Sequence, residues 1–181
     1  EMVKLFNPKD INKSASIYNT EKLDWLNSHY IKNTPNDELA GLLLPYDVDI
    51  TAHEKKETIL DALKERAKTL KELAELVKEI LTTPTEYEAK AIKKAFKDNA
   101  FDVLNGYSEK LITNEPKLAS DYHALMEEVV SEMEIGFGKI GMPLRVALLG
   151  KMGGPNIDVI MEVIGKEETL FRISQAITEN S

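Results

Sequence analysis

Hydrophobic residues recur along most of this chain every three or four positions, and polar residues fill the positions between them. This spacing is typical of amphipathic α-helices that bury one face. It is clearest over residues 53–81, where the polar positions are mostly Lys and Glu. The apolar positions of that segment include Ile59, Leu63, Leu70, Ala74, Val77 and Leu81. The pattern predicts one long helix there, or two helices with a short break.

The same spacing, combined with capping residues, glycines and prolines, predicts the other helices. Their expected ranges are 19–32, 36–44, 86–106, 120–141, 143–150, 156–164 and 166–177. In this interpretation Gly106 ends a helix, Ser120 or Asp121 caps the next one, and Pro143 lies in a first helical turn. Only RVALLG and VIGKE resemble strands, and two short isolated strands do not form a stable sheet. We therefore predict an all-α fold.

The stretch TTPTE, at residues 82–86, interrupts the helical pattern and contains a proline. We predict a boundary near Pro84 between two small helical subdomains in tandem, residues 1–84 and residues 85–181. A length of 181 residues is sufficient for two small units, each with its own core. The opening stretch EMVKLFNPKD resembles the end of a helix and has no signal-peptide character, so we expect the chain to be a fragment.

Composition narrows the classes of function. The chain has no cysteine, which excludes a disulfide framework and cysteine-ligated metal sites and suits a reducing cytoplasm. No apolar run approaches the roughly 20 residues that a membrane span needs, so we expect no membrane partner. The net charge of −8 argues against broad non-specific binding of DNA or RNA. It leaves room for a local basic groove.

The glycine-rich stretch GKMGG, at residues 150–154, does not match the known nucleotide-binding loops. A phosphate-binding loop needs Ser or Thr after its lysine, but Met152 follows Lys151 here. The glycine spacing also differs from the dinucleotide-binding fingerprint, and no βαβ unit surrounds it. The stretch is better interpreted as a tight turn between two helices, with Pro155 opening the second helix and Gly165 ending it.

Catalytic and metal-binding candidates are few. The three histidines, His29, His53 and His123, lie far apart in the sequence, and we interpret them as packing or surface residues. Asp47 and Asp49 do not complete a calcium-binding pattern. The remaining carboxylates are spread along polar helix faces, which predicts solvated positions. We therefore assign this chain no catalytic residue and no metal site.

Two stretches near the ends of the chain resemble the bacterial glutamyl-tRNA synthetases. The segment INKSASIYNTEKLDWLNSHYIK, residues 11–32, matches the pattern K-S-x-x-x-[FY]-[DN]-x-x-K-L-x-W-[LM]-N-x-x-Y-I that follows the catalytic domain in that family. Near the other end, the family pattern is P-L-R-x-A-L-x-G, a variable turn ending in proline, a helix, and then G-K-E-x-x-L-x-R-[IL]. Its matching residues here are Pro143, Leu144, Arg145, Ala147, Leu148, Gly150, Pro155, Gly165, Lys166, Glu167, Leu170, Arg172 and Ile173.

The resemblance implies a tRNA-recognition module built from two α-helical subdomains. In the family, a catalytic domain with its ATP and Mg²⁺ sites comes first, and its two signature motifs are absent here. The implied partners are therefore tRNA(Glu) and the catalytic domain of the same polypeptide. The implied reaction is ATP-dependent attachment of glutamate to tRNA, and this chain alone is expected to be inactive, with no cofactor of its own.

The resemblance also implies which residues meet RNA. The arginine of P-L-R contacts the anticodon in the family, and it corresponds to Arg145. A second anticodon-reading arginine, on a helix in a pattern like R-x-x-T-L-K-E, corresponds less closely to Arg66. The other implied tRNA-binding residues are Gly154, Pro155, Lys151, Lys13 and Lys32. Gly154 stands where relatives often carry Ser or Thr, so a hydroxyl contact is expected to be lost.

Structural roles and other functions remain alternatives to these assignments. Arg145 is also suited to capping or to an ion pair, Arg66 to a solvated helix surface, and Arg172 to a structural ion pair. The Lys- and Glu-rich helices are equally compatible with a protein–protein interaction module that has no RNA role. Within the family, a form that charges tRNA(Gln), or both tRNAs, is a further alternative.

Overall fold

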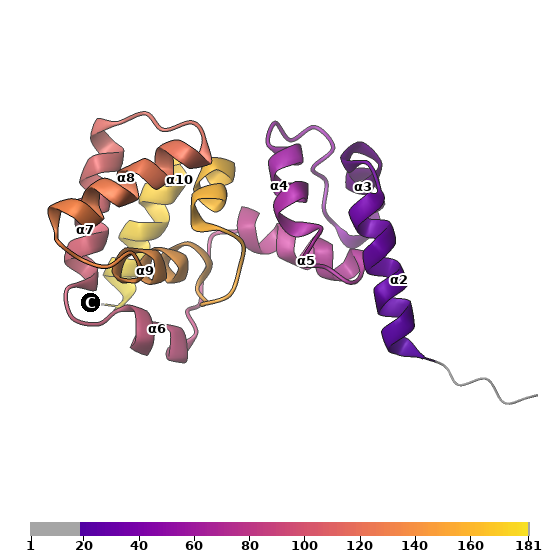
Figure 1. The fold of residues 1–181 in the computed structure, drawn as a ribbon, viewed down its shortest axis with the longest axis horizontal. Coiled ribbons are helices and arrows are strands. Elements are labelled where there is room, and N and C mark those ends of the chain that lie inside the picture. Colours follow the sequence, from indigo (N-terminus) through magenta and orange to yellow (C-terminus); the bar gives the residue numbers. More distant parts are fainter. Residues whose placement is uncertain (1–18, 181) are drawn as a thin grey trace, which may run out of the picture.

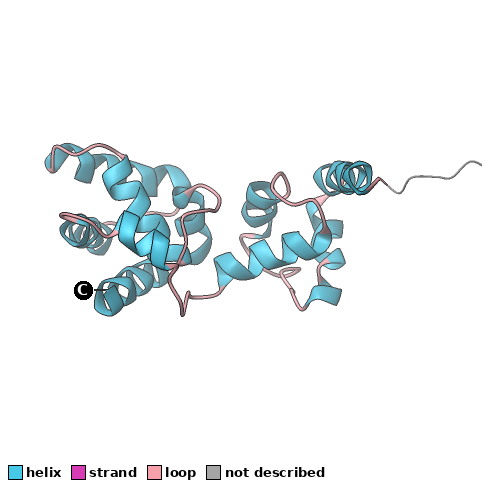
Figure 2. Ribbon diagram, turned by 90° about the horizontal axis from the view of Figure 1, so that it is seen from below, coloured by secondary structure: helices cyan, strands magenta, loops and turns pink. Residues whose placement is uncertain are grey.

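The computed structural model describes residues 19–180, and every regular element in that range is helical (Figures 1 and 2). The elements are α2 (Thr20–Asn33), α3 (Asn36–Leu42), the short 3-10 helix η2 (Leu44–Tyr46), α4 (Lys56–Leu63), α5 (Leu70–Leu81), α6 (Ala89–Ala95), α7 (Ala100–Thr113), α8 (Ala119–Glu132), α9 (Gly138–Leu149) and α10 (Ile157–Asn180). The all-α prediction is confirmed. The predicted contact residue Lys13 and the start of the first family motif lie outside the described residues.

Helices α2 to α5 form one group and helices α6 to α10 form another, with α5 extending from the first toward the second (Figure 1). Helix α10 packs against α8 and α9 in its own group and also against α4 and α5. As a result, one continuous apolar core extends from Ile31 to Ala176. The groups meet at residues 82–88, but the division into subdomains at residue 84 stays a prediction.

The segment over residues 53–81 forms two helices, α4 and α5. The break is stabilised at Thr69, whose side-chain oxygen accepts a hydrogen bond from the backbone N–H of Glu72 at 3.1 Å. The Glu72 carboxylate in turn accepts from the backbone N–H of Lys68 at 2.7 Å. These reciprocal bonds satisfy N–H groups that a helix start leaves free. The first buried turn of α5 is thereby fixed next to the turn that carries Arg66.

Three expected helix boundaries were wrong. Residues 86–106 do not form one helix, because Asp98 adopts a left-handed backbone (φ 54°) between α6 and α7. Gly106 is inside α7, which continues to Thr113, so it does not end the helix. Helix α8 ends at Glu132, shortly before Glu134 takes a positive φ of 52°.

Two helix starts, those of α9 and α8, also differ from expectation. Helix α9 begins at Gly138, so Pro143 lies inside it rather than in its first turn. Helix α8 begins at Ala119, and Asp121 acts within its first turn by accepting the backbone N–H groups of Lys117 and Leu118, both at 2.9 Å. Helix α2 begins as expected, and Asn19 caps it because its side chain accepts a hydrogen bond from the backbone N–H of Lys22.

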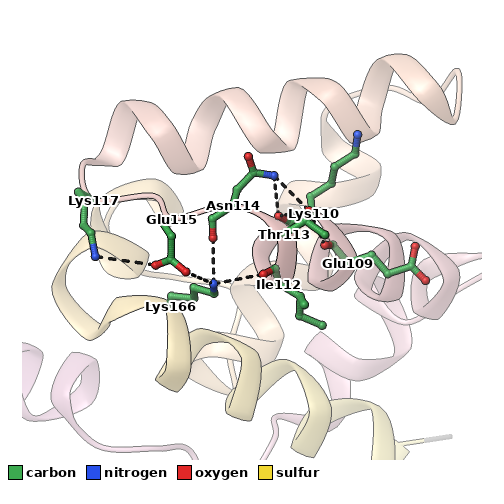
Figure 3. Close-up of polar contacts among 8 residues, drawn as sticks. All are labelled: Glu109, Lys110, Ile112, Thr113, Asn114, Glu115, Lys117 and Lys166. Atoms are coloured by element: carbon green, nitrogen blue, oxygen red, sulfur yellow. Dashed lines mark hydrogen bonds and ion pairs between the residues drawn. The ribbon is translucent and has the colours of Figure 1, made fainter.

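Helix α10 is interrupted at Gly165, which has φ 81° and ψ 172°, as the predicted helix end requires. The residue that follows, Lys166, anchors the second half of α10 to the end of α7 (Figure 3). Its ammonium group donates to the carbonyls of Asn114 at 2.9 Å and Ile112 at 3.3 Å and pairs with Glu115 at 2.7 Å. A lysine that binds the free carbonyls of a helix C-terminus stabilises that end.

Arg172, in the same half of α10, is almost completely buried and has a structural role. Its Nε donates to the carboxylate of Glu168 at 2.7 Å, and its Nη1 donates to the Leu148 carbonyl at 2.9 Å. Glu168 also accepts a hydrogen bond from Thr83 in the segment between the two groups. This network holds the end of α9, the 82–88 segment and α10 together.

Candidate nucleic-acid interface

Arg145 lies near the C-terminal end of α9, and its side chain is directed to the turn that connects α9 to α10. Its Nη1 donates a 2.6 Å hydrogen bond to the backbone carbonyl of Pro155, and Pro155 is itself buried. This bond uses only part of the guanidinium, which carries several N–H donors in one plane. The side chain is half-buried and forms no ion pair with a residue in the 19–180 range. Its remaining donors are available to a ligand.

Arg66 was expected on a helix, but it lies in the turn between α4 and α5. It is exposed, and its side chain makes no hydrogen bond or ion pair with any other described residue. Burial lowers the pKa of Arg145, and the nearby positive charge of Arg66 lowers it further, whereas Asp158 acts to raise it. The two predicted arginines, far apart in the sequence, therefore lie close enough for their charges to interact. A pair of like charges of this kind favours a ligand rich in acceptors or negative charge.

Beside Arg145 is an open pocket of about 500 Å³ between α8, α9 and the start of α10. One wall is aromatic, because the rings of His123 and Phe137 stack with centroids 5.2 Å apart. Polar groups at its edge include Asn156 and Asp158, and Asp158 lies 3.4 Å from His123 Nδ1. A flat apolar wall with polar groups at one edge suits a planar ring that carries hydrogen-bonding atoms.

The turn that follows α9 needs its glycines. Gly150 ends the helix with φ 71°, and a Cβ atom there would lie 2.4 Å from the carbonyl oxygen of Glu86. Gly154 has φ 143°, and its Cβ would lie 2.5 Å from the Leu149 side chain and 3.5 Å from Arg145 Nη1. A positive φ and this close approach both favour glycine. Gly154, the position at which a hydroxyl contact is expected to be lost, thus allows the backbone of the turn to lie close to Arg145.

Two of the predicted lysine contacts form ion pairs within the chain. Lys151 Nζ lies 2.6 Å from a carboxylate oxygen of Glu79 at the end of α5, and Lys32 Nζ lies 2.5 Å from Glu65. Glu65 directly precedes Arg66, so Lys32 belongs to the same part of the surface. Exposed pairs of this kind contribute little stability and exchange readily for other anions. Phosphate contacts by these lysines stay predictions.

The aromatic wall of the pocket is not apparent from the sequence. Phe137 falls within the helix expected over 120–141, but it lies after the end of α8 and is 40% exposed. The turn at Glu134 redirects the chain and brings Phe137 back over His123. No spacing rule links these two residues, so the stacked pair could not be inferred from periodicity.

Metal and membrane chemistry find no support in the described residues. No cluster of three or more His, Asp or Glu side chains within residues 19–180 is arranged to hold a metal ion. Among the helices of that range, none combines the length and the apolar character needed to cross a membrane.

Comparison with known proteins identifies the family of the chain. A family model described as an anticodon binding domain matches residues 38–177. The chain therefore belongs to the anticodon-binding domain family.

The chain is similar to glutamate–tRNA ligase 1 of Sulfurimonas denitrificans. The two are 62% identical over 178 residues, which cover 98% of this chain and 38% of the relative. Glutamate–tRNA ligase 2 of Nitratiruptor sp. is 56% identical over 99% of this chain and 39% of its own length. A crystal structure of a glutamate tRNA ligase from Elizabethkingia meningosepticum, in complex with its amino acid, superposes with a TM-score of 0.85 at 28% identity, over 99% of this chain and 36% of that one. The chain thus spans well under half the length of these relatives.

Proposed function

We propose that this chain is the tRNA-binding part of a glutamate–tRNA ligase and that Arg145 and Arg66 contact the anticodon of tRNA(Glu). The observation that carries the proposal is the position of Arg145 beside an open, aromatic-walled pocket, with Arg66 close enough for its charge to act on Arg145. Neither arginine forms an ion pair with another described residue. Membership of the anticodon-binding domain family supports the same function.

The chemistry of the pocket suits unstacked bases. Anticodon bases leave the helical stack, so their faces and their edges are both accessible to a protein. The exposed ring of Phe137 offers a stacking surface, while the planar guanidinium of Arg145 donates hydrogen bonds to a base edge. Asp158 and Asn156 provide acceptors for an exocyclic amino group. The bond to Pro155 fixes the direction of the arginine, which reduces the entropy lost on binding.

In this proposal, the reaction itself takes place in another part of the same polypeptide. That part would bind ATP and Mg²⁺, activate glutamate and transfer it to the tRNA in the cytoplasm. The glutamate–tRNA ligase names of the relatives, and the fraction of their length that this chain matches, support the division of labour. The 181-residue chain is then expected to be inert with glutamate and ATP. Measurable glutamate-dependent ATP–pyrophosphate exchange by this chain alone would contradict the division.

The binding test uses the 181-residue chain and a tRNA(Glu) transcript, measured by filter binding in about 50 mM salt. We expect Arg145→Ala to weaken binding by about 10- to 100-fold, the effect of losing one good bidentate base contact of 1–3 kcal/mol. Arg66→Ala is expected to have an effect of the same order. Lys71→Ala is the control, because Lys71 is exposed on α5 and its only ion pair with a described residue, Glu75, is long at 3.9 Å.

Specificity is tested with the same variants and a transcript that carries a glutamine anticodon. If Arg66 reads the anticodon, the parent chain prefers the glutamate transcript and Arg66→Ala reduces that preference. Equal binding of both transcripts by the parent would indicate the non-discriminating form, and a preference for the glutamine transcript the tRNA(Gln)-charging form. Parental affinity in both arginine variants would refute the site assignment.

A further inference from the structure

Helix α6 carries a concentration of positive charge that the proposed anticodon site does not use. Between Ala89 and Lys97 the chain contains four lysines and no acidic residue. The four are Lys90, Lys93, Lys94 and Lys97. All are exposed, and none makes a side-chain hydrogen bond or ion pair with a residue in the described range. Most other described lysines, such as Lys55 and Lys151, lie in ion pairs.

The lysines share one face of the helix. Lys90, Lys93 and Lys94 have the spacing i, i+3, i+4, and Lys97 lies two residues after the last residue of the helix. The opposite face, formed by Ala91 and Ala95, is buried against Val146 of α9. Because this small-residue contact fixes the rotation of α6, the lysines are held outside the buried contact with α9.

Helix stability does not account for this arrangement. Like charges at i, i+3 and i, i+4 destabilise a helix by about 0.2–0.5 kcal/mol per pair. The helix dipole favours Lys93 and Lys94 in the last turn, but it disfavours Lys90 in the first turn. Repulsion among clustered lysines, offset only at Lys97 by the neighbouring Asp98, is instead expected on a chain with net charge −8 where an anionic partner binds.

The basic face adjoins the proposed anticodon pocket. Lys94 and Lys97 line an open cavity of about 410 Å³ between α6 and the start of α9. This cavity shares the lining residues Gly138 and Met142 with the pocket beside Arg145, so the two hollows are neighbours on α9. In Figure 1, α6 lies directly below α9, the helix that carries Arg145. A strand whose base entered the pocket would have its neighbouring phosphates within reach of the lysines.

We propose that the basic face of α6, formed by Lys90, Lys93, Lys94 and Lys97, binds the phosphate backbone of the RNA whose bases enter the Arg145 pocket. This inference rests on the proposed function and adds a second surface to it. Phosphate contacts fix the position and orientation of a nucleic acid but carry little sequence information, whereas base contacts specify the sequence. The acidic protein would thus hold RNA through one local basic surface and read it through another.

The experiment measures the salt dependence of binding of a tRNA(Glu) transcript by the chain and by the triple variant Lys93→Gln/Lys94→Gln/Lys97→Gln. Each phosphate contact to a single strand contributes about −0.7 to the slope of log K against log salt, so losing three contacts reduces the slope by roughly two. Affinity at about 50 mM salt is expected to fall on the order of 10-fold or more. The preference between glutamate and glutamine anticodons is expected to remain.

Two matched variants complete the experiment. Lys22→Gln/Lys78→Gln/Lys117→Gln removes the same charge from exposed positions elsewhere, and it is expected to retain nearly the parental slope. Replacing the α6 lysines with arginine retains the charge, and it is expected to restore binding. Circular dichroism checks that the variants fold alike.

The outcomes separate this inference from the proposed function. Parental slope and affinity in the glutamine variant, while Arg145→Ala weakens binding, would overturn the α6 surface and leave the anticodon site standing. Failure of the parent chain to bind the transcript would overturn both. If the glutamine variant instead lost only binding to phosphatidylserine vesicles, the lysines would belong to a membrane contact, and the inference would be wrong.

Discussion

At the residue scale, glycine positions determine where the turn after α9 can lie. Gly150 and Gly154 both have positive φ, while the neighbouring Gly153 has an ordinary backbone and open space around its Cβ position. A non-glycine residue in the left-handed region costs about 1–3 kcal/mol. At Gly150 the obstacle is the rigid backbone carbonyl of Glu86, whereas at Gly154 it is the end of a flexible leucine side chain.

These contacts predict different costs for the same substitution. Gly150→Ala is expected to lower the free energy of unfolding by about 2 kcal/mol or more, because the new methyl group meets Glu86 and the backbone is strained. Gly153→Ala is the control, and it is expected to change stability by less than about 1 kcal/mol. Urea denaturation followed by circular dichroism measures both. An equal loss in the two variants would contradict the positional argument.

At the element scale, the ends of the helices are joined by buried polar groups. Arg172 binds the Leu148 carbonyl near the end of α9, and Glu168 joins Arg172 to Thr83 in the segment between the two helix groups. Partial burial acts to raise the pKa of Glu168, but the hydrogen bonds from Thr83 and Arg172 lower it more, so it stays below its usual value. The part of the family pattern that contains Arg172 is therefore explained by architecture.

Arg172→Met tests this structural role. The substitution leaves the Leu148 carbonyl without its partner and removes one of the two donors to Glu168, so we expect a loss of about 3–5 kcal/mol in unfolding free energy. Lys71→Met removes a cation from an exposed pair with Glu75 at 3.9 Å, and it is expected to cost less than about 0.5 kcal/mol. Thermal and urea unfolding provide the comparison. A small loss for Arg172→Met, close to that of the control, would show that the buried network is dispensable.

The sequence predicted elements better than it predicted their ends. Helical spacing identified the all-α class and the turn after α9, because these depend on local patterns of apolar residues, glycine and proline. The break at Asp98 carries neither glycine nor proline, and Pro143 is tolerated inside α9, so both boundaries depend on packing. The proximity of Arg66 to Arg145 also depends on how α4 and α5 pack against α10. The resemblance implies that both arginines contact the anticodon, but periodicity does not predict that they lie close together.

At the scale of the whole molecule, one carboxylate connects parts of the chain that lie far apart in sequence. Glu162 of α10 lies 3.2 Å from Lys55 Nζ, and it accepts hydrogen bonds from Thr58 at 3.3 Å and from the backbone N–H of Ala119 at 2.8 Å. The first two partners belong to the helix group before residue 84, and the third begins α8. Burial acts to raise the pKa of Glu162, but these bonds lower it more, so that it lies below the ordinary value of 4.5.

This depressed pKa predicts that acid weakens the connection between the two helix groups. The folded state binds the Glu162 proton less tightly than the unfolded state does, so the stabilisation is complete above about pH 4.5 and is lost as the pH falls through the lower folded value. Glu168 acts in the same direction. We expect the thermal midpoint to change little between about pH 7 and pH 5 and to fall below that range.

Glu162→Gln is expected to lower the midpoint at pH 7 and to make the fall in acid shallower. Glu21→Gln is the matched control, because the Glu21 side chain has no hydrogen-bond or ion-pair partner among the described residues, and it is expected to follow the parent curve. Parallel acid curves for the parent and Glu162→Gln would show that Glu162 does not connect the two groups.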